Sequence, residues 1–353
     1  MHHDSSRDSN VGMVIQYLKK ISNEYEFTYI TKDDVNGLKG KGMLKNFISF
    51  FIIKPYHLAT SNYILLDDAF LPLAYLKFKE KVKVIQLWHG TGTIKKFGQD
   101  VNTGKLKELE YKINQNITHL IVNSSSIIDI YSKAFGVSKN KVYPLGLPRT
   151  DTLFQKEKLE NEVSKFYLKY PELKEKKILL YAPTFRDEET QDPKLHLDYA
   201  KLLEGISDDW VLLLKLHPFV ASRFHLKEEE ERKYRGRLYD YSFYPDLNTL
   251  MGVSDILVTD YSSIIFEYCL QNKPIIFYAY DLEEFSNHGR GFYEPYEEYV
   301  PGPIVHSTQD LIEVLNHDIY PMEKIIMFKE THYDYLDGQS TKRLVNKVIP
   351  LTY

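Results

Sequence analysis

The stretch Met251–Tyr278 constrains the fold most strongly, because its pattern predicts a strand, a tight turn, a helix and a second strand in direct succession. The short β-branched run Ile256–Val258 is typical of a buried parallel strand, and four small or polar residues at 260–263 precede an apolar helical stretch, Ile264–Gln271. The next strand is expected at Ile275–Tyr278. A helix that begins at the carboxyl end of a buried strand indicates an α/β fold with a parallel sheet.

The turn before this helix favours an anion. A helix start leaves backbone N–H groups unpaired and carries a partial positive charge, and the hydroxyls of Ser262 and Ser263 would add donors. The simpler alternative is that Asp260 and the two serines only cap the helix. The turn alone does not decide between a phosphate site and a cap.

Two further strands in the second half end in polar residues. We expect these strands at Lys177–Tyr181 and Trp210–Leu216. Because the carboxyl ends of parallel strands meet at one edge of a sheet, their side chains should lie near the serine turn, which favours the phosphate reading. The polar residues at these two ends are Thr184, Arg186, Lys215 and His217.

The first half repeats this organisation. Buried strands are expected at Tyr63–Asp68, Val82–Trp88 and His119–Asn123. The second of them runs into His89-Gly90-Thr91-Gly92, where the glycines would let the backbone approach a ligand and the threonine would add a donor. A histidine at such a strand end favours a functional role over a purely structural one.

Length and composition limit the class of protein. At 353 residues the chain exceeds one compact core, so we expect two domains, 1–150 and 151–353, and leave open whether the last helix crosses back to the first. The 45 Lys and Arg residues are balanced by 49 Asp and Glu, and a net charge of −4 argues against a nucleic-acid partner. The single cysteine, Cys269, excludes an internal disulfide and is expected in the core.

The start of the chain departs from the usual nucleotide-binding pattern. A helix is expected directly from Asn10, with Val14 and Leu18 on its apolar side, and a strand at Glu26–Thr31. The usual opening strand is therefore expected to be missing or to be supplied by another part of the protein. No secretory signal or membrane-spanning run is visible in the sequence.

The segment Lys39–Lys54 combines basic ends with a dense run of Phe and Ile. Such a helix suits the anionic surface of a membrane, where it would lie in the interface on the cytoplasmic side. A buried crossover helix of the first domain would explain the same residues, and both interpretations stay open.

Six motifs, in this order, resemble the CDP-glycerol glycerophosphotransferases, the enzymes of teichoic-acid synthesis. The motifs are LWHGTGTIKKFG (Leu87–Gly98), YAPTFRD (Tyr181–Asp187), KLHPF (Lys215–Phe219), SDILVTDYSSIIFEY (Ser254–Tyr268), RGFYEPYEEYVPGPIV (Arg290–Val305) and DGQSTKR (Asp337–Arg343).

The resemblance implies two Rossmann-like domains of the glycosyltransferase B type with a cleft between them, the first facing the acceptor and the membrane and the second holding most of CDP-glycerol. It implies a peripheral enzyme on the cytoplasmic face of the cell membrane. There a hydroxyl of a lipid-linked acceptor, carried on a polyprenyl diphosphate, would attack the β-phosphorus and release CMP. The oligomeric state is left open.

The resemblance also assigns catalytic roles, with His89 as the base and His217 as a contact to the pyrophosphate. Ser262 and Ser263 would hold donor phosphate. Glu267 would accept hydrogen bonds from donor hydroxyls, unless it is simply an exposed carboxylate at the helix start. The remaining donor-binding candidates are Trp88, Gly90, Thr91, Gly92, Arg149, Thr184, Arg186, Lys215 and Asp260.

Three alternatives remain. One is a ribitolphosphotransferase that uses CDP-ribitol, because those enzymes share the motifs, and another is a nucleotide-sugar glycosyltransferase of the same fold. The third is a non-catalytic membrane-associated binding protein, against which the presence of both His89 and His217 argues. The chain has no Asp-x-Asp pair, so a diphosphate-chelating metal site of that type is not expected, and a requirement for divalent cations stays open.

Overall fold

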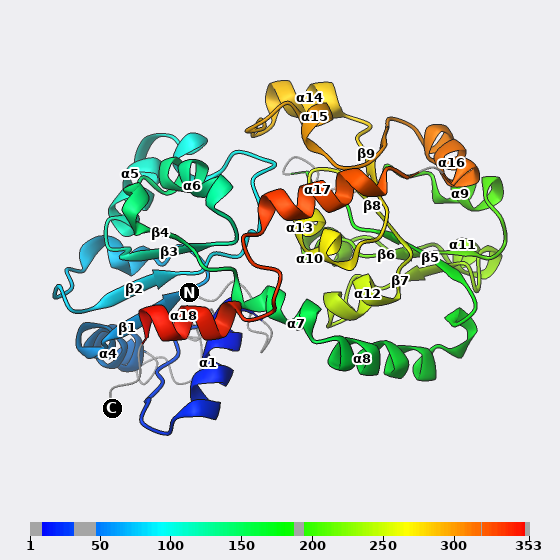
Figure 1. Ribbon diagram of the computed structural model, residues 1–353. Coiled ribbons are helices and arrows are strands. Elements are labelled where there is room, and N and C mark those ends of the chain that lie inside the picture. The colour runs from blue at the N-terminus through cyan, green and yellow to red at the C-terminus, as the bar shows by residue number, and fades with distance from the viewer. Residues whose placement is uncertain (1–8, 32–46, 187–193, 319, 350–353) are drawn as a thin grey trace. The chain divides into compact units, whose positions relative to one another are not determined.

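The computed structural model describes residues 9–31, 47–186, 194–318 and 320–349 (Figure 1). The chain divides into two compact units. Among the described residues, unit 1 holds those up to Thr91, Lys96–Phe154 and those from His332 onward, whereas unit 2 holds Gly92–Lys95 and Gln155–Thr331. Each unit contains one parallel sheet, so the predicted α/β class is confirmed.

The sheet of unit 1 has four parallel strands in the order β1-β2-β3-β4. The first three fall where strands were predicted, and β4 follows α6 Ile128–Phe135. Their bounds are β1 Tyr63–Leu66, β2 Lys83–Gln86, β3 His119–Val122 and β4 Val142–Pro144.

Alternating side chains cover the two faces of this sheet. Ile85 and Ile121 pack with α1 and α18 on one face, whereas Leu120 and Val122 pack with α6 on the other. Both faces are buried because crossover helices cover them, which is why these strands are almost continuously apolar. The helices of unit 1 are α1 Asn10–Ile21, α4 Lys54–Thr60, α5 Gly104–Asn114, α6 Ile128–Phe135, α7 Asp151–Phe154 and α18 Ser340–Val348.

The prediction of α1 is confirmed. Ser9 caps it by accepting a hydrogen bond from the Gly12 N–H at 3.0 Å, and Val14 and Leu18 are buried. The predicted strand at Glu26–Thr31 is wrong, because this stretch forms no regular secondary structure and pairs with no strand among the described residues. They and β1 line the same cavity of about 160 Å³, and the segment is anchored by side chains such as Phe27 rather than by a backbone ladder.

The predicted interfacial helix Lys39–Lys54 lies partly outside the described residues. From Phe47 the backbone is helical, with a π-helical turn at Ser49–Ile53 that leads into α4. Large apolar side chains on it are exposed, among them Phe51 at 52% and Ile52 at 62%. In the part of the chain that the structure describes, no helix is both long and apolar enough to cross a membrane.

The sheet of unit 2 has six parallel strands in the order β10-β9-β8-β5-β6-β7. Tyr181 at the end of β5 lies opposite Leu214 of β6 and Val258 of β8, so the carboxyl ends of these three strands are level. The bounds are β5 Lys177–Tyr181, β6 Trp210–Leu214, β7 Leu238–Asp240, β8 Ile256–Thr259, β9 Ile275–Tyr278 and β10 Ile304–Val305.

Helices pack against the sheet of unit 2. The α9 and α16 helices lie side by side and share a core with β5, β6 and β8 (Figure 1). The α8 and α12 helices pack together so closely that a Cβ on Gly252 would lie 2.9 Å from Val163. The helices are α8 Lys156–Lys169, α9 Tyr199–Gly205, α10 Pro218–Ala221, α11 Glu228–Lys233, α12 Leu247–Val253, α13 Ile264–Tyr268, α14 Leu282–His288, α15 Tyr296–Tyr299, α16 Thr308–His317 and α17 Met322–His332.

The strand–turn–helix–strand pattern that began the sequence analysis is present as β8, α13 and β9. The helix is shorter than predicted, since a 3₁₀ turn at Cys269–Gln271 follows α13 and Asn272 ends it in the left-handed conformation. Cys269 is buried as expected, and its burial raises the pKa of the thiol. Cys269 is therefore a core residue.

Candidate functional site

The first group of site residues begins at Trp88, just after β2. Its φ of 53° lies in the left-handed region, which non-glycine residues rarely adopt. Its N–H donates to Gln86 Oε1 at 2.9 Å, and its carbonyl accepts from the Asn10 side-chain amide at 2.8 Å. Backbone strain of about 1–3 kcal/mol persists only where the surroundings impose it. Gln86 and Asn10 therefore hold the bend that positions the next residue, His89.

The orientation of the His89 ring is fixed from β1. Its Nδ1 lies 3.2 Å from the carbonyl oxygen of Asp67, and its ring centroid is 4.2 Å from that of Trp88. Because a carbonyl oxygen only accepts, Nδ1 carries the proton and Nε2 keeps its lone pair. The Asp67 carboxylate in turn accepts from the Val11 N–H at 3.2 Å. This tautomer suits a general base.

Asn10 joins this loop to Arg149. Besides donating to the Trp88 carbonyl, its side chain accepts from the Arg149 N–H at 2.9 Å, and Asn10 is buried. The Arg149 guanidinium donates to Thr91 Oγ1 at 2.9 Å. Sequence reasoning treated Asn10 only as the start of a helix. The sequence did contain a signal for this role. Asn10 follows the N-cap serine directly, and its carboxamide can donate and accept hydrogen bonds at the same time.

The other residues of this motif lie in two places. The Gly90 carbonyl accepts from the Tyr131 hydroxyl at 2.9 Å, and Thr91 is buried in unit 1. Gly92 belongs to unit 2. The structure therefore brings Trp88, His89, Gly90, Thr91 and Arg149 together, and it does so within unit 1.

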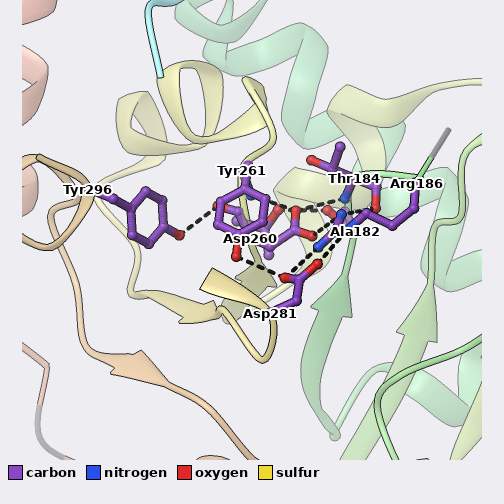
Figure 2. A network of polar contacts seen from close by, with 8 residues as sticks. Ala182, Thr184, Arg186, Asp260, Tyr261, Asp281 and Tyr296 are labelled. Atoms are coloured by element: carbon purple, nitrogen blue, oxygen red, sulfur yellow. Dashed lines mark hydrogen bonds and ion pairs between the residues drawn. The ribbon is translucent and has the colours of Figure 1, made fainter. Parts of the chain in front are cut away.

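The second group surrounds a buried ion cluster in unit 2, formed by Arg186, Asp260 and Asp281 (Figure 2). The guanidinium donates to both carboxylate oxygens of Asp281, at 2.7 and 2.9 Å, to Asp260 Oδ2 at 3.0 Å and to the Thr184 carbonyl at 2.8 Å. Burial opposes the positive charge, but the hydrogen bonds to Asp281 and the charge of Asp260 outweigh it and raise the pKa of Arg186. Arg186 therefore remains charged.

The ion cluster ties together the ends of three neighbouring strands, β5, β8 and β9. Asp260 also accepts from the Thr184 N–H at 2.7 Å, and its own carbonyl accepts from the Tyr296 hydroxyl at 2.9 Å. The Tyr261 hydroxyl donates to Asp281 at 2.9 Å (Figure 2). Burial and the charge of Asp281 raise the pKa of Tyr261, so it stays protonated as a donor. The cluster thus sets the positions of the turns after these strands.

Sequence reasoning missed Asp281, Tyr261 and Tyr296 as members of this group. Asp281 follows β9 by three residues, at the same edge of the sheet as the predicted residues. The signal was therefore present, because β9 was predicted and its carboxyl end also carries a polar side chain. Arg186 makes hydrogen bonds and ion pairs with the protein's own carboxylates, which gives it a structural role in addition to the predicted contact with the donor.

Thr184, Asp260 and His217 meet in one small cavity of about 20 Å³. Thr184 Oγ1 is buried and has no hydrogen-bond partner among the described residues. A buried hydroxyl without a partner is costly, which makes it a candidate contact for a ligand. The His217 ring packs on Phe185 with centroids 4.3 Å apart, which fixes the ring at the wall of this cavity.

Lys215 is held differently from its neighbour His217. Its amine donates to the carbonyls of Ser242 at 2.7 Å and Tyr244 at 2.8 Å. Burial lowers the pKa of Lys215, and the charges of Asp240 and Asp246 act against that shift. These two hydrogen bonds stabilise the chain after β7.

The serine turn has the backbone geometry of a helix start. Ser263 is the N-cap of α13 and makes no side-chain capping bond, and Ser262 Oγ accepts from the Ile264 N–H at 3.4 Å. Glu267, one turn along, is only 5% exposed, so the interpretation as an exposed carboxylate is wrong. The long Ser262 contact makes a weak cap, which leaves these hydroxyls suited to a ligand.

A second serine turn, at the end of β3, shows what such a turn binds. There the carboxylate of Asp334 accepts from the Ser124 hydroxyl at 2.9 Å and from the N–H of Ser125 at 3.0 Å. The protein's own anion thus occupies the start of the helical region that leads into α6.

Across residues 9–31, 47–186, 194–318 and 320–349, no group of three or more His, Cys, Asp or Glu side chains is arranged to hold a metal ion.

The chain resembles several enzymes of teichoic-acid synthesis. It is 34% identical over 345 residues to the teichoic acid poly(ribitol-phosphate) polymerase of Bacillus spizizenii, covering 96% of this chain and 54% of that protein. It is 37% identical to the teichoic acid ribitol-phosphate polymerase TarL of Staphylococcus aureus, covering 83% and 52%. It is 32% identical to the teichoic acid glycerol-phosphate primase of Bacillus subtilis, covering 82% and 74%. The chain thus spans about half the length of the polymerases.

The fold is similar to that of the wall teichoic acid polymerase TagF. The TM-score is 0.79 at 22% identity, over 98% of this chain and 86% of that chain. A UDP-GlcNAc 2-epimerase from Neisseria meningitidis is more distant, with a TM-score of 0.54 at 14% identity over 96% of this chain and 89% of that chain. The sequence profile of the CDP-glycerol:poly(glycerophosphate) glycerophosphotransferases matches residues 2–350. The chain therefore belongs to the CDP-glycerol:poly(glycerophosphate) glycerophosphotransferase family.

Proposed function

We propose that this protein transfers a polyol phosphate, glycerol phosphate in the first instance, from its CDP-activated form to a hydroxyl of a teichoic-acid or related capsule-polymer acceptor. The observation that carries the proposal is the fixed tautomer of His89, whose Nε2 is left as a base. The buried Thr184 hydroxyl, His217 and the serine turn at the carboxyl edge of the unit 2 sheet supply the groups for a diphosphate. Family membership supports the same reaction.

The proposed reaction is a displacement at phosphorus. The acceptor hydroxyl loses its proton to His89 Nε2 as its oxygen forms a bond to the β-phosphorus. The bond from that phosphorus to the bridging oxygen breaks, and the electron pair leaves with CMP. Donors at the serine turn and His217 would stabilise charge on the diphosphate, since positioning and electrostatics do most of the work in such transfers.

The donor would sit mostly on unit 2 and the acceptor on unit 1, in the two-domain arrangement of the glycosyltransferase B type. Supporting this are the parallel sheet in each unit and the similarity in fold to TagF. TagF structures include a variant soaked with CDPG. We propose domain limits close to 1–150 and 151–353. The segment from His332 onward would return to the first domain, since it folds as part of unit 1.

Ribitol phosphate is the alternative group. The observation that supports it is the 37% identity to TarL, compared with 32% to the glycerol-phosphate primase. The deciding experiment measures CMP release from CDP-glycerol and from CDP-ribitol, each with and without a lipid-linked acceptor. The preferred donor is the one with the higher kcat/KM. Transfer from a UDP-sugar instead, or turnover of none of these donors, would reject the proposal.

The serine turn gives a prediction about binding. Replacing Ser262 and Ser263 together by alanine should weaken CDP-glycerol binding about 10–30-fold, or about 1–2 kcal/mol, because donors to the diphosphate are lost. Cytidine binding should change less than twofold. Titration calorimetry with both ligands measures this, and Ser124→Ala, in the turn that Asp334 already occupies, is the control. An equal loss for both ligands would show that the serines act only on the fold.

We also propose that the protein is peripheral on the cytoplasmic face of the cell membrane, bound there through the helix around Phe47–Tyr56, because its acceptor would carry a polyprenyl diphosphate. Exposed side chains along this helix support the proposal. An apolar helical face with basic residues at its end binds anionic lipid surfaces. The exposed apolar residues are Phe47, Ile48, Phe51, Ile52, Ile53 and Tyr56.

Vesicle sedimentation tests the membrane proposal. Changing Lys39, Lys41 and Lys45 to glutamate should abolish binding to anionic vesicles, since each basic residue near the surface contributes about 1 kcal/mol. Phe51→Ser with Ile52→Ser should weaken binding to neutral vesicles as well. Activity on a short soluble acceptor should survive in both variants. Leu168→Ser, at an exposed leucine of α8, is the control. Wild-type sedimentation of both variants would place the docking surface elsewhere.

A further inference from the structure

Residues Gly92–Lys95, here named the crossing segment, follow the His89 loop in the sequence but fold as part of unit 2. Lys95 forms an antiparallel bridge with Phe292. The Ile94 carbonyl accepts from the Tyr293 N–H at 3.2 Å, and Ile94 is buried. Backbone pairing and burial together make the crossing segment a built-in part of unit 2.

The side chain of Thr93 anchors the same segment. Its Oγ1 lies 3.0 Å from the Tyr299 hydroxyl, and Thr93 is only 2% exposed. The Tyr299 ring packs against Phe328 with centroids 5.6 Å apart, and Phe328 packs against Phe266 of α13 at 5.1 Å. Thr93 thus connects the segment to the aromatic residues that support α13.

Gly92 makes the closest contact of the segment. A Cβ at this position would lie 1.7 Å from Cε2 of Phe266 and 2.1 Å from Cδ2 and Cζ. Phe266 is 1% exposed, so its ring has little room to move. The φ of Gly92 is not in the left-handed region, so glycine is required here by the close approach to the ring rather than by backbone conformation.

Only Gly90 and Thr91 stand between His89 and the crossing segment. A chain extends at most about 3.3–3.6 Å per residue, so the Cα atoms of His89 and Gly92 lie within about 11 Å of each other. Phe266 stands three residues after Ser263 in α13. Covalent geometry therefore limits how far the backbone of the proposed base can move from Gly92.

We infer that Gly92 and Phe266 are positioning residues, whose contact holds in place the chain that directly follows the proposed base His89. This inference rests on the proposed function. A misplacement of about 1 Å between reacting groups can cost on the order of 100-fold in rate. Pushing the crossing segment off Phe266 should therefore slow turnover more than it weakens donor binding.

The test compares Gly92→Ala with the double variant Gly92→Ala, Phe266→Val, which removes all three ring atoms that meet the new methyl group. With the preferred CDP-polyol as donor, Gly92→Ala should lower kcat about 10–100-fold while the donor Kd stays within threefold. The double variant should recover kcat to within about fivefold of Phe266→Val alone. The matched control is Gly205→Ala, whose Cβ would meet Ile312 at 2.6 Å in the same unit but away from the crossing segment, and it should keep its kcat.

Wild-type kcat in Gly92→Ala, or no recovery in a folded double variant, would overturn the inference. Hydrogen exchange of the intact protein separates this failure from that of the proposed function. Gly92→Ala should raise the exchange of the amides of residues 93–95, and Phe266→Val should reverse the increase. If the wild type releases no CMP from either CDP-polyol, the proposed function fails. In that case the exchange of amides 93–95 alone tests the contact between Gly92 and Phe266. Unchanged exchange in Gly92→Ala would refute the role of that contact.

Discussion

His89→Ala should lower the rate of CMP release by about 10²–10⁴-fold, while CDP-glycerol binds within a few-fold of the wild-type affinity. The reason is the fixed tautomer of the ring. Nδ1 donates to the Asp67 carbonyl, so the lone pair of the neutral ring lies on Nε2, the atom that would take the acceptor proton. Removal of the imidazole takes away the base without removing the diphosphate donors of unit 2. Single-turnover kinetics with the preferred CDP-polyol and its acceptor measures the chemical step.

Two controls sharpen this experiment. His317→Ala removes an exposed histidine at the end of α16 and should leave the rate unchanged. Added imidazole should restore part of the rate of His89→Ala, because a free base can occupy the vacated space. A rate near that of wild type at saturating substrates would exclude His89 as the base, and a parallel loss of donor affinity would indicate a binding role instead.

Asp281→Ala should lower the free energy of unfolding of unit 2 by about 3–5 kcal/mol, because it leaves the buried Arg186 charge without its bidentate partner. Asp260 remains, but it supplies only one hydrogen bond to the guanidinium. The Tyr261 hydroxyl loses its acceptor as well. Hydrogen exchange of peptides from β5 and β8 in the intact chain measures this loss for unit 2 separately.

The control for Asp281→Ala is Glu228→Ala, which breaks the exposed pair with Arg232 on α11. Both side chains of that pair are mostly in water, so the loss should stay below about 1 kcal/mol. Arg186→Met should also destabilise unit 2, because it leaves two buried carboxylates unneutralised. Equal, small effects of Asp281→Ala and Glu228→Ala would show that the ion cluster does not hold the strand ends together.

The sequence by itself determined the local elements of the site. Short β-branched runs predicted β5, β6, β8 and β9, since a strand buried on both faces must be continuously apolar. Parallel pairing then brought Thr184, His217 and Asp260 to one edge, as predicted, because the carboxyl ends of parallel strands meet there. His89 was found in the same way, from a strand that ends in a histidine and glycines.

The tertiary structure decided what depends on contacts between distant residues. Asn10 holds the Trp88 carbonyl across 78 residues, and Arg186 binds Asp281 across 95, and no local pattern encodes such pairs. The stretch Glu26–Thr31 has a strand-like sequence but pairs with no strand in the part of the chain that the structure describes, since pairing requires a backbone partner that the local residues do not specify. Position 92 has no room for a Cβ because the ring of Phe266, 174 positions later in the chain, occupies the space beside Gly92.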